Sequence, residues 1–224
     1  MNNETGSAIP YPAGEVRYSF EMYATYEGEI SCSPSHAGSI ECVFQKINPD
    51  DVYDPVWELR VRTGPVRLIE EVIEIGNAIK DAIFDRMSLA LNVRIDRVKL
   101  ASYSLTPAPG TGAVAHLILS GYLLNATGRV GCKPLLDDTV LALQDAVAKP
   151  PDPQNAALVA LYRYALSADD PVVKFLNLYL ILYEIMKSQP KVDEFIMRVA
   201  PTPQTESPNK PGTLETTYTR LRNQ

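Results

Sequence analysis

Alternating apolar and polar residues predict β-strands in the first part of the chain. The run at residues 16–23 has the two-residue period of a half-buried strand, and the runs at 39–44 and 56–62 have a similar pattern. Two further runs, at 97–105 and 114–125, are separated by a turn rich in proline and glycine. These runs predict a sheet with one buried face.

A helical pattern lies between the third and fourth of these runs, at residues 65–91. Its apolar residues recur at the spacing that places them on one face of a helix. Examples are Leu68, Val72, Ile75 and Ile79. From Pro134 onward the period is helical throughout. Early strands and late helices predict an α+β protein. We expect a flexible arm at 1–14, an α+β domain of unknown type at 15–133 and a helical domain at 134–224.

Four helices are expected within this later region, at residues 135–148, 155–166, 171–188 and 192–199. The third begins with Asp170 as an N-cap and Pro171 at the first helical position, which is a strong start signal. The segment 200–212 carries four prolines, so we expect irregular structure there.

The last predicted helix covers residues 213–224, with Thr213 as its N-cap. Leu214, Tyr218 and Leu221 follow one another at i, i+4 and i+7 and would form an apolar stripe. No glycine or proline closes the helix, so we expect a chain truncated at its C-terminus. The flank formed by Glu215, Thr219 and Arg222 is, taken alone, typical of a solvated face.

The helix at 171–188 is apolar on most of its surface. Its clearly polar residues fall within one sector of roughly 140°, and they are Lys174, Asn177, Glu184 and Lys187. Such a helix is either central in a core or packs on the core with one side and on a partner with the other. The second alternative predicts a homodimer, which a charge inserted at whichever of Leu178 or Ile181 is exposed would disrupt.

Composition narrows the class of protein. The net charge of −6 argues against the basic face that duplex DNA binding requires. Cys32, Cys42 and Cys132 are an odd number without short paired spacing, which favours a reducing compartment. The N-terminus lacks a secretory signal pattern, and the most apolar stretch, 175–183, is far shorter than the ~20 residues of a membrane span. We therefore expect a cytoplasmic protein that does not bind membranes.

The sequence contains little that indicates a metal, cofactor or nucleophile site. Cys32, His36 and Cys42, with Glu41 or Cys132 as a fourth ligand, lack the close pairs of structural zinc sites, and we expect no metal. No phosphate-binding loop or nucleophile elbow is present, so we expect no cofactor. His116 lies in a strand-like run and is expected to be a buried, hydrogen-bonded residue.

Three segments of the last third resemble the C-terminal part of HEPN-type helical domains, near the methylamine-utilisation J-like and abortive-infection defence relatives. They are 170–179 (Asp-Pro-Val-Val-Lys-Phe-Leu-Asn-Leu-Tyr), 192–196 (Val-Asp-Glu-Phe-Ile) and, after a proline-rich loop, 215–223 (Glu-Thr-Thr-Tyr-Thr-Arg-Leu-Arg-Asn). The resemblance covers about residues 155–224 and leaves the N-terminal region unidentified.

This resemblance implies a dimeric helical bundle that acts on RNA as an effector or sensor, with antiphage defence as a setting. Active members are metal-independent ribonucleases with an Arg, a polar residue and a His a few positions further on. Arg222 and Asn223 match the first two, Glu184 matches an acidic residue used by some members, and the His would follow Gln224. We therefore expect no ribonuclease activity without that His. The alternative is a non-catalytic interaction or sensor module that dimerises through its helical domain.

Overall fold

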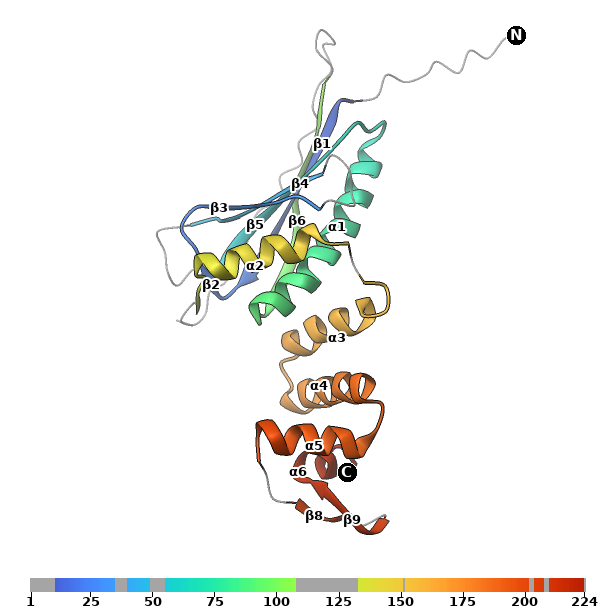
Figure 1. Ribbon diagram of the computed structural model, residues 1–224. Helices are drawn as coiled ribbons and strands as arrows, with labels where there is room; N and C mark the ends of the chain where they lie inside the picture. Colours follow the sequence, from blue (N-terminus) through green and yellow to red (C-terminus); the bar gives the residue numbers. More distant parts are fainter. Residues whose placement is uncertain are drawn as a thin grey trace, which may run out of the picture. The chain divides into compact units, whose positions relative to one another are not determined.

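The computed structural model describes residues 11–34, 40–48, 55–107, 133–150, 152–201, 204–207 and 210–223. The chain divides into two compact units, 1–159 and 160–224. The predicted α+β class is confirmed: an antiparallel sheet with a helix comes first, and the C-terminal region is mostly helical (Figure 1).

The first unit is built on a five-stranded antiparallel sheet with the order β3-β4-β5-β1-β6. The strands are β1 (Ala13–Met22), β3 (Glu29–Cys32), β4 (Glu41–Lys46), β5 (Val56–Thr63) and β6 (Ile95–Thr106). The short strands β2 (Ala24–Thr25) and β7 (Lys133–Pro134) pair in parallel outside this sheet. The sequence pattern predicted four of the five strands and missed β3, which is only four residues long.

One face of the sheet is packed against α1 (Ile69–Leu91). Alternate residues of β1, among them Val16, Tyr18 and Phe20, are almost fully buried, as the two-residue period requires. The Phe20 and Phe84 rings have centroids 4.7 Å apart. Gly76 lets the helix approach closely, because a Cβ there would lie 2.2 Å from Cγ1 of Val16.

The opposite face carries charged side chains that pair with each other. Glu15 lies between Arg17 at 2.6 Å and Arg62 at 3.0 Å. Burial pushes the pKa of Glu15 up, but the hydrogen bonds from Arg62 and Arg17 and the charges of Arg17 and Arg60 outweigh it and lower the pKa. An antiparallel sheet needs only one apolar face, so successive side chains along its strands alternate between the buried apolar face and the charged face.

The helix α2 (Asp137–Ala148) belongs to the core of the first unit, although the change of period at Pro134 groups it with the later helices in the sequence. Val140, Leu143 and Val147 are buried in the same cluster as the sheet residues. Gln144 donates from Nε2 to the backbone oxygen of Ser31, 2.9 Å away, on the edge strand β3. A helix side chain thus provides a hydrogen-bond donor for a backbone carbonyl on the edge strand.

The remaining helices are α3 (Ala156–Ser167), α4 (Pro171–Met186), α5 (Gln189–Val199) and α6 (Thr217–Asn223), and a hairpin of β8 (Gln204–Ser207) and β9 (Lys210–Thr216) precedes α6. The second unit begins within α3. Asp170 accepts a 2.7 Å hydrogen bond from the backbone N–H of Val172, so the predicted N-cap of α4 is present. The core of this unit is small and consists of Tyr179, Val192 and Ile196, with partly buried side chains around them.

The prediction of one helix over residues 213–224 is wrong. Residues up to Thr216 pair with β8, and the helix begins only at Thr217. Gly212, with φ of +79°, turns the chain, and its N–H donates to Glu206 Oε1 at 2.6 Å. Strand pairing takes up the backbone N–H and C=O groups that a helix would have used, so the proline-rich segment forms a hairpin instead of irregular structure.

Two details of that prediction change with it. The N-cap is Thr216 rather than Thr213, because Oγ1 of Thr216 accepts from the backbone N–H of Thr219 at 3.3 Å. Leu214 lies in β9 and is exposed, so it forms no stripe with Tyr218 and Leu221. The predicted strand at 114–125 with His116, most of the turn before it, and His36, Cys132 and Gln224 lie outside the described residues.

Candidate functional site

Arg222 lies half-buried on α6 against two aromatic rings of α4. Its Cζ is 5.1 Å from the ring centroid of Tyr179 and 5.9 Å from that of Tyr183. Its Nη2 donates to Oε1 of Gln189 at 3.1 Å, while Nε is buried and has no hydrogen-bond partner. The guanidinium is therefore held in place by cation–π contacts and one hydrogen bond.

Glu184 and Arg222 line the same pocket, which has a volume of about 420 Å³. The other lining residues are Leu176, Tyr179, Leu180 and Tyr183, so its walls are mainly apolar and aromatic. The Glu184 carboxylate accepts from Nζ of Lys187 at 2.9 Å. Two of the three residues that the HEPN resemblance singles out thus lie at one pocket, although each charge has another partner.

Asn223 is the third of these residues, and its contact is with a different group. Its Nδ2 donates to Oε2 of Glu215 at 3.4 Å. Glu215 is fully buried, and its Oε1 has no hydrogen-bond partner. The expected solvated face of Glu215, Thr219 and Arg222 is therefore wrong, because Glu215 and Thr219 are both 0% exposed.

A buried hydrogen-bond network joins α4, α5, β9 and α6 around Asp193. Oδ1 of Asp193 accepts from the hydroxyls of Thr216 at 2.6 Å and Thr219 at 2.7 Å, and from the backbone N–H of Thr216 at 3.1 Å. Because the Thr219 hydroxyl donates to Asp193, the Tyr179 hydroxyl, 2.7 Å away, donates to Thr219. Four elements are thus connected through one carboxylate oxygen.

Tyr179 links this network to Arg222, because its hydroxyl bonds Thr219 while its ring contacts the guanidinium. Burial raises the pKa of Tyr179, although the Thr219 hydrogen bond and the charge of Arg222 act in the opposite direction. The phenol remains a neutral hydrogen-bond donor, and the network is suited to holding α6 in place.

Sequence reasoning missed Asp193, Thr216 and Tyr179 as members of a polar centre. One signal was available, because Asp193 shares a helix face with Ile196, three residues on, and both are buried. A carboxylate at such a position needs partners. Those partners come from distant segments, and the helix assumed for residues 213–224 concealed them.

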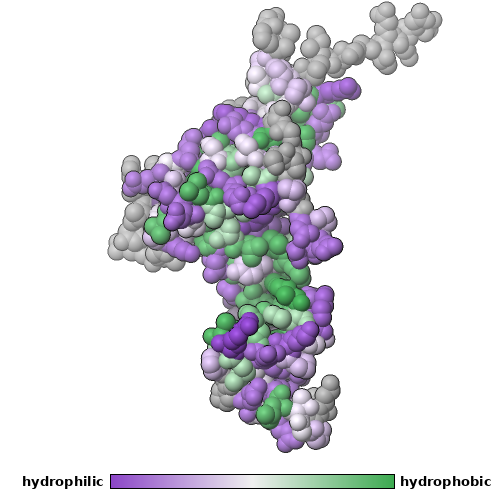
Figure 2. Space-filling model, in the orientation of Figure 1, coloured by the Kyte–Doolittle hydropathy of each residue, from purple (hydrophilic) through white to green (hydrophobic). Residues whose placement is uncertain are grey.

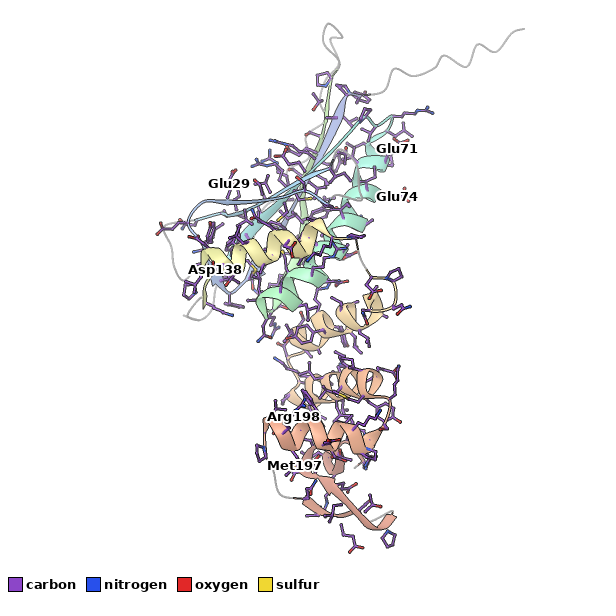
Figure 3. The ribbon with its side chains drawn as sticks, in the orientation of Figure 1. Glu29, Glu71, Glu74, Asp138, Met197 and Arg198 are labelled. Atoms are coloured by element: carbon purple, nitrogen blue, oxygen red, sulfur yellow. The ribbon has the colours of Figure 1, made fainter. Side chains whose placement is uncertain are left out.

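Five large apolar residues of α4 are exposed; Ile185, at 57%, lies apart from the other four, which fall within one sector of the helix. These four are Val172 at 61%, Val173 at 37%, Leu176 at 41% and Leu180 at 46%, and we refer to them as the α4 stripe. Hydrophobic residues are visible at the surface over α3 and α4 in Figure 2. Charged residues such as Arg198 of α5, labelled in Figure 3, are exposed in the usual way. Leu178 and Ile181, the positions named for charge insertion, are only half-exposed.

Within the described ranges, no three His, Cys, Asp or Glu side chains are grouped as metal ligands would be. Of the described helices, none has the length and hydropathy needed to cross a bilayer. Comparison with protein-family models, with curated proteins and with solved structures finds no match for this chain.

Proposed function

We propose that this chain is an interaction module that assembles with a second copy of itself through the α4 stripe. The observation that carries the proposal is the exposure of Val172, Val173, Leu176 and Leu180 on one helix. Contiguous exposed apolar side chains of this kind mark interaction surfaces. The neighbouring side of α4, which carries Tyr179, already packs against α5, so the stripe is a further apolar surface of the same helix.

The shape of this surface favours a second copy as the partner. Leu176 and Leu180 belong to the stripe and also line the 420 Å³ pocket with Tyr183. One helix face therefore offers both projecting side chains and a hollow. A twofold-symmetric interface requires such self-complementarity, because the same patch is used on both sides.

The charges at the two ends of α4 favour an antiparallel arrangement. Asp170 stands at the start of the helix, and the exposed Lys187 follows its end. In an antiparallel pair, each Lys187 would approach Asp170 of the other copy, and the two helix dipoles would oppose one another. Two buried free thiols, Cys32 and Cys42, fit a reducing compartment such as the cytoplasm as the setting.

Sedimentation velocity tests this proposal. For residues 1–224 we expect a reversible dimer with a dissociation constant in the range of ~10 µM, or about −7 kcal/mol. Leu176→Asp and Leu180→Asp should each leave a monomer, because a carboxylate would be buried without a partner. The matched control is Leu141→Asp, at a leucine of α2 that is 61% exposed, and it should dimerise normally. A monomer at all concentrations, or equal behaviour of the three variants, would contradict the proposal.

A second candidate function is action on RNA, as the HEPN resemblance implies, in an effector or sensor of antiphage defence. The supporting observation is that Arg222 and Glu184 line one pocket with two tyrosines. Of the two rings, that of Tyr183 is only half-buried and offers a face on which a base can stack, and an arginine binds phosphate; these are the elements of single-strand recognition.

Fluorescence anisotropy with a single-stranded RNA tests this second function. Arg222→Ala should weaken binding about tenfold, whereas the matched Arg220→Ala, on the same short helix, should change it little. Equal losses in both variants would show nonspecific charge attraction and would rule out this pocket as the RNA site.

A further inference from the structure

Cys32 and Cys42 are opposite each other in the sheet of the first unit. They are register partners in the antiparallel β3–β4 pair, and both are buried free thiols with 3% and 0% exposure. Directly opposed residues of an antiparallel pair have Cα atoms about 4.5 to 5.5 Å apart, which lies within the roughly 4.4 to 6.8 Å that a disulfide spans. The backbone therefore already has a geometry that a disulfide can bridge.

The closed fold protects these thiols from oxidation. Burial raises the pKa of Cys32 to about 11 and that of Cys42 to about 12, the latter helped by the neighbouring Cys32 and Glu41. The thiolate is the species that attacks an oxidant, so both groups are nearly inert at neutral pH while they stay covered.

The cover over β3 is the helix α2. Leu143 of α2 is fully buried in the same cluster as the two cysteines, and Gln144 holds the backbone of Ser31, the residue before Cys32. The strand β3 is the edge of its sheet, and among the described elements α2 and β4 are its main contacts. If α2 moved away, Cys32 would be the first thiol exposed, because it lies on the edge strand.

We propose that Cys32 and Cys42 are a latent cross-strand disulfide that forms only when α2 leaves β3 in the presence of a disulfide oxidant such as oxidised glutathione. The Cys32 thiolate attacks one sulfur of the oxidant and releases one glutathione thiolate. The Cys42 thiolate then attacks the Cys32 sulfur of this mixed disulfide and releases the second. Two protein thiols are oxidised, their two protons pass to the two released glutathione thiolates, and one oxidised glutathione becomes two reduced molecules.

The product would bind the edge strand covalently to β4 and would close a short loop between residues 32 and 42. Since this loop already closes in the fold, the disulfide restricts mainly the unfolded chain. The fold and the disulfide therefore favour each other, and the pair records whether α2 has opened under oxidising conditions.

The experiment uses the full chain with Cys132→Ser, equilibrated in glutathione buffers, quenched with acid and mapped by mass spectrometry. We expect a Cys32–Cys42 crosslink whose equilibrium constant is at least about tenfold higher in the folded chain than in the chain unfolded in urea. Leu143→Ala should accelerate crosslinking about tenfold or more, because it weakens the contact of α2 with the core. Leu141→Ala, at an exposed leucine of the same helix, should leave the rate unchanged.

Two outcomes would overturn the proposal. If each cysteine accumulates its own mixed disulfide with glutathione, or if the equilibrium constant is no higher in the folded chain, the strands do not present a bridgeable pair. If Leu143→Ala and Leu141→Ala crosslink at the same rate, α2 does not control access to the thiols.

Discussion

Each of the two units of this chain is stabilised internally by a different kind of interaction. Among the described residues, the first unit has a continuous core cluster of 25 buried residues, whereas the buried cluster of the second contains three. The second unit instead buries Asp193, Thr216 and Thr219, which bond one another and Tyr179. A unit of this size can bury little apolar area, so buried hydrogen bonds carry more of its stability.

The comparison also explains why the two units leave different surfaces open. The sheet of the first unit uses its apolar residues on the face that α1 covers and fills the other face with ion pairs such as Arg62 with Glu15. In the second unit, α4 has more apolar surface than α5 covers, and the α4 stripe remains exposed. Both units leave leucines exposed, such as Leu68 and Leu141 in the first, and in the second unit four exposed apolar residues lie together on α4.

The largest expected effect is in the apolar core. Phe84→Ala should cost about 3 to 5 kcal/mol of unfolding free energy, because it removes a fully buried ring that contacts Phe20 in a tilted arrangement and leaves a cavity. The fluorescence of Trp57, the single tryptophan of the chain, reports unfolding of this unit. Leu89→Ala, on the same helix but 52% exposed, is the control and should cost well below ~1 kcal/mol. Similar losses in both variants would show that α1 does not anchor this core.

The corresponding change in the second unit is at Asp193. Asp193→Ala should cost about 3 kcal/mol, because two buried hydroxyls and one N–H lose their shared acceptor. Amide hydrogen exchange of peptides within residues 189–223 measures the loss, and Trp57 fluorescence should not change. Glu194→Ala, at the exposed neighbour, is the control. Unaltered exchange in the Asp193 variant would mean that the network does not stabilise this unit.

Alkaline pH should weaken the first unit in particular. The folded pKa values of Cys32, Cys42 and Tyr18 are raised, to about 11, 12 and 12, by burial, and for Tyr18 also by Asp81. A raised pKa means that the folded state holds its proton more tightly, so stability is fully present below the unfolded pKa and is lost as pH rises from about 9 toward 12.

Between pH 9 and pH 10 the two thiols alone should account for a loss of about 2 kcal/mol, seen in urea unfolding followed by Trp57 fluorescence. The double variant Cys32→Ser, Cys42→Ser removes these thiols and should flatten the decline between pH 9 and pH 10. If the decline is as steep in this variant, other groups cause it.

The smallest effect concerns one hydroxyl of the network. Thr219→Val keeps the side-chain shape but removes the group that bonds both Tyr179 and Asp193, and it should cost about 1 to 2 kcal/mol. Thr213→Val, at an exposed position on β9, should change amide exchange little. If the two threonine variants behave alike, the hydrogen bonds of Thr219 do not stabilise this unit.

Several elements could be predicted from local pattern because their signals lie within a few residues. The burial of alternate residues in β1 follows its two-residue period, and the start of α4 follows Asp170 and Pro171. The candidate site was harder, since Arg222 and Glu184 come from separate helices and meet at the pocket only after folding. That they share a pocket follows from the packing of α6 on α4, which no local pattern records.

By itself, the sequence determined the α+β class, most strands of the first unit, the positions of α1 to α5 and the excess of apolar surface on α4, because periodicity and capping act between near neighbours. Only the tertiary structure decided that residues 210–216 form a strand, that Glu215 is buried and that Cys32 lies opposite Cys42. These features depend on which distant segment supplies the hydrogen-bond partner, and that choice is settled by the free energy of the whole fold rather than by local preference.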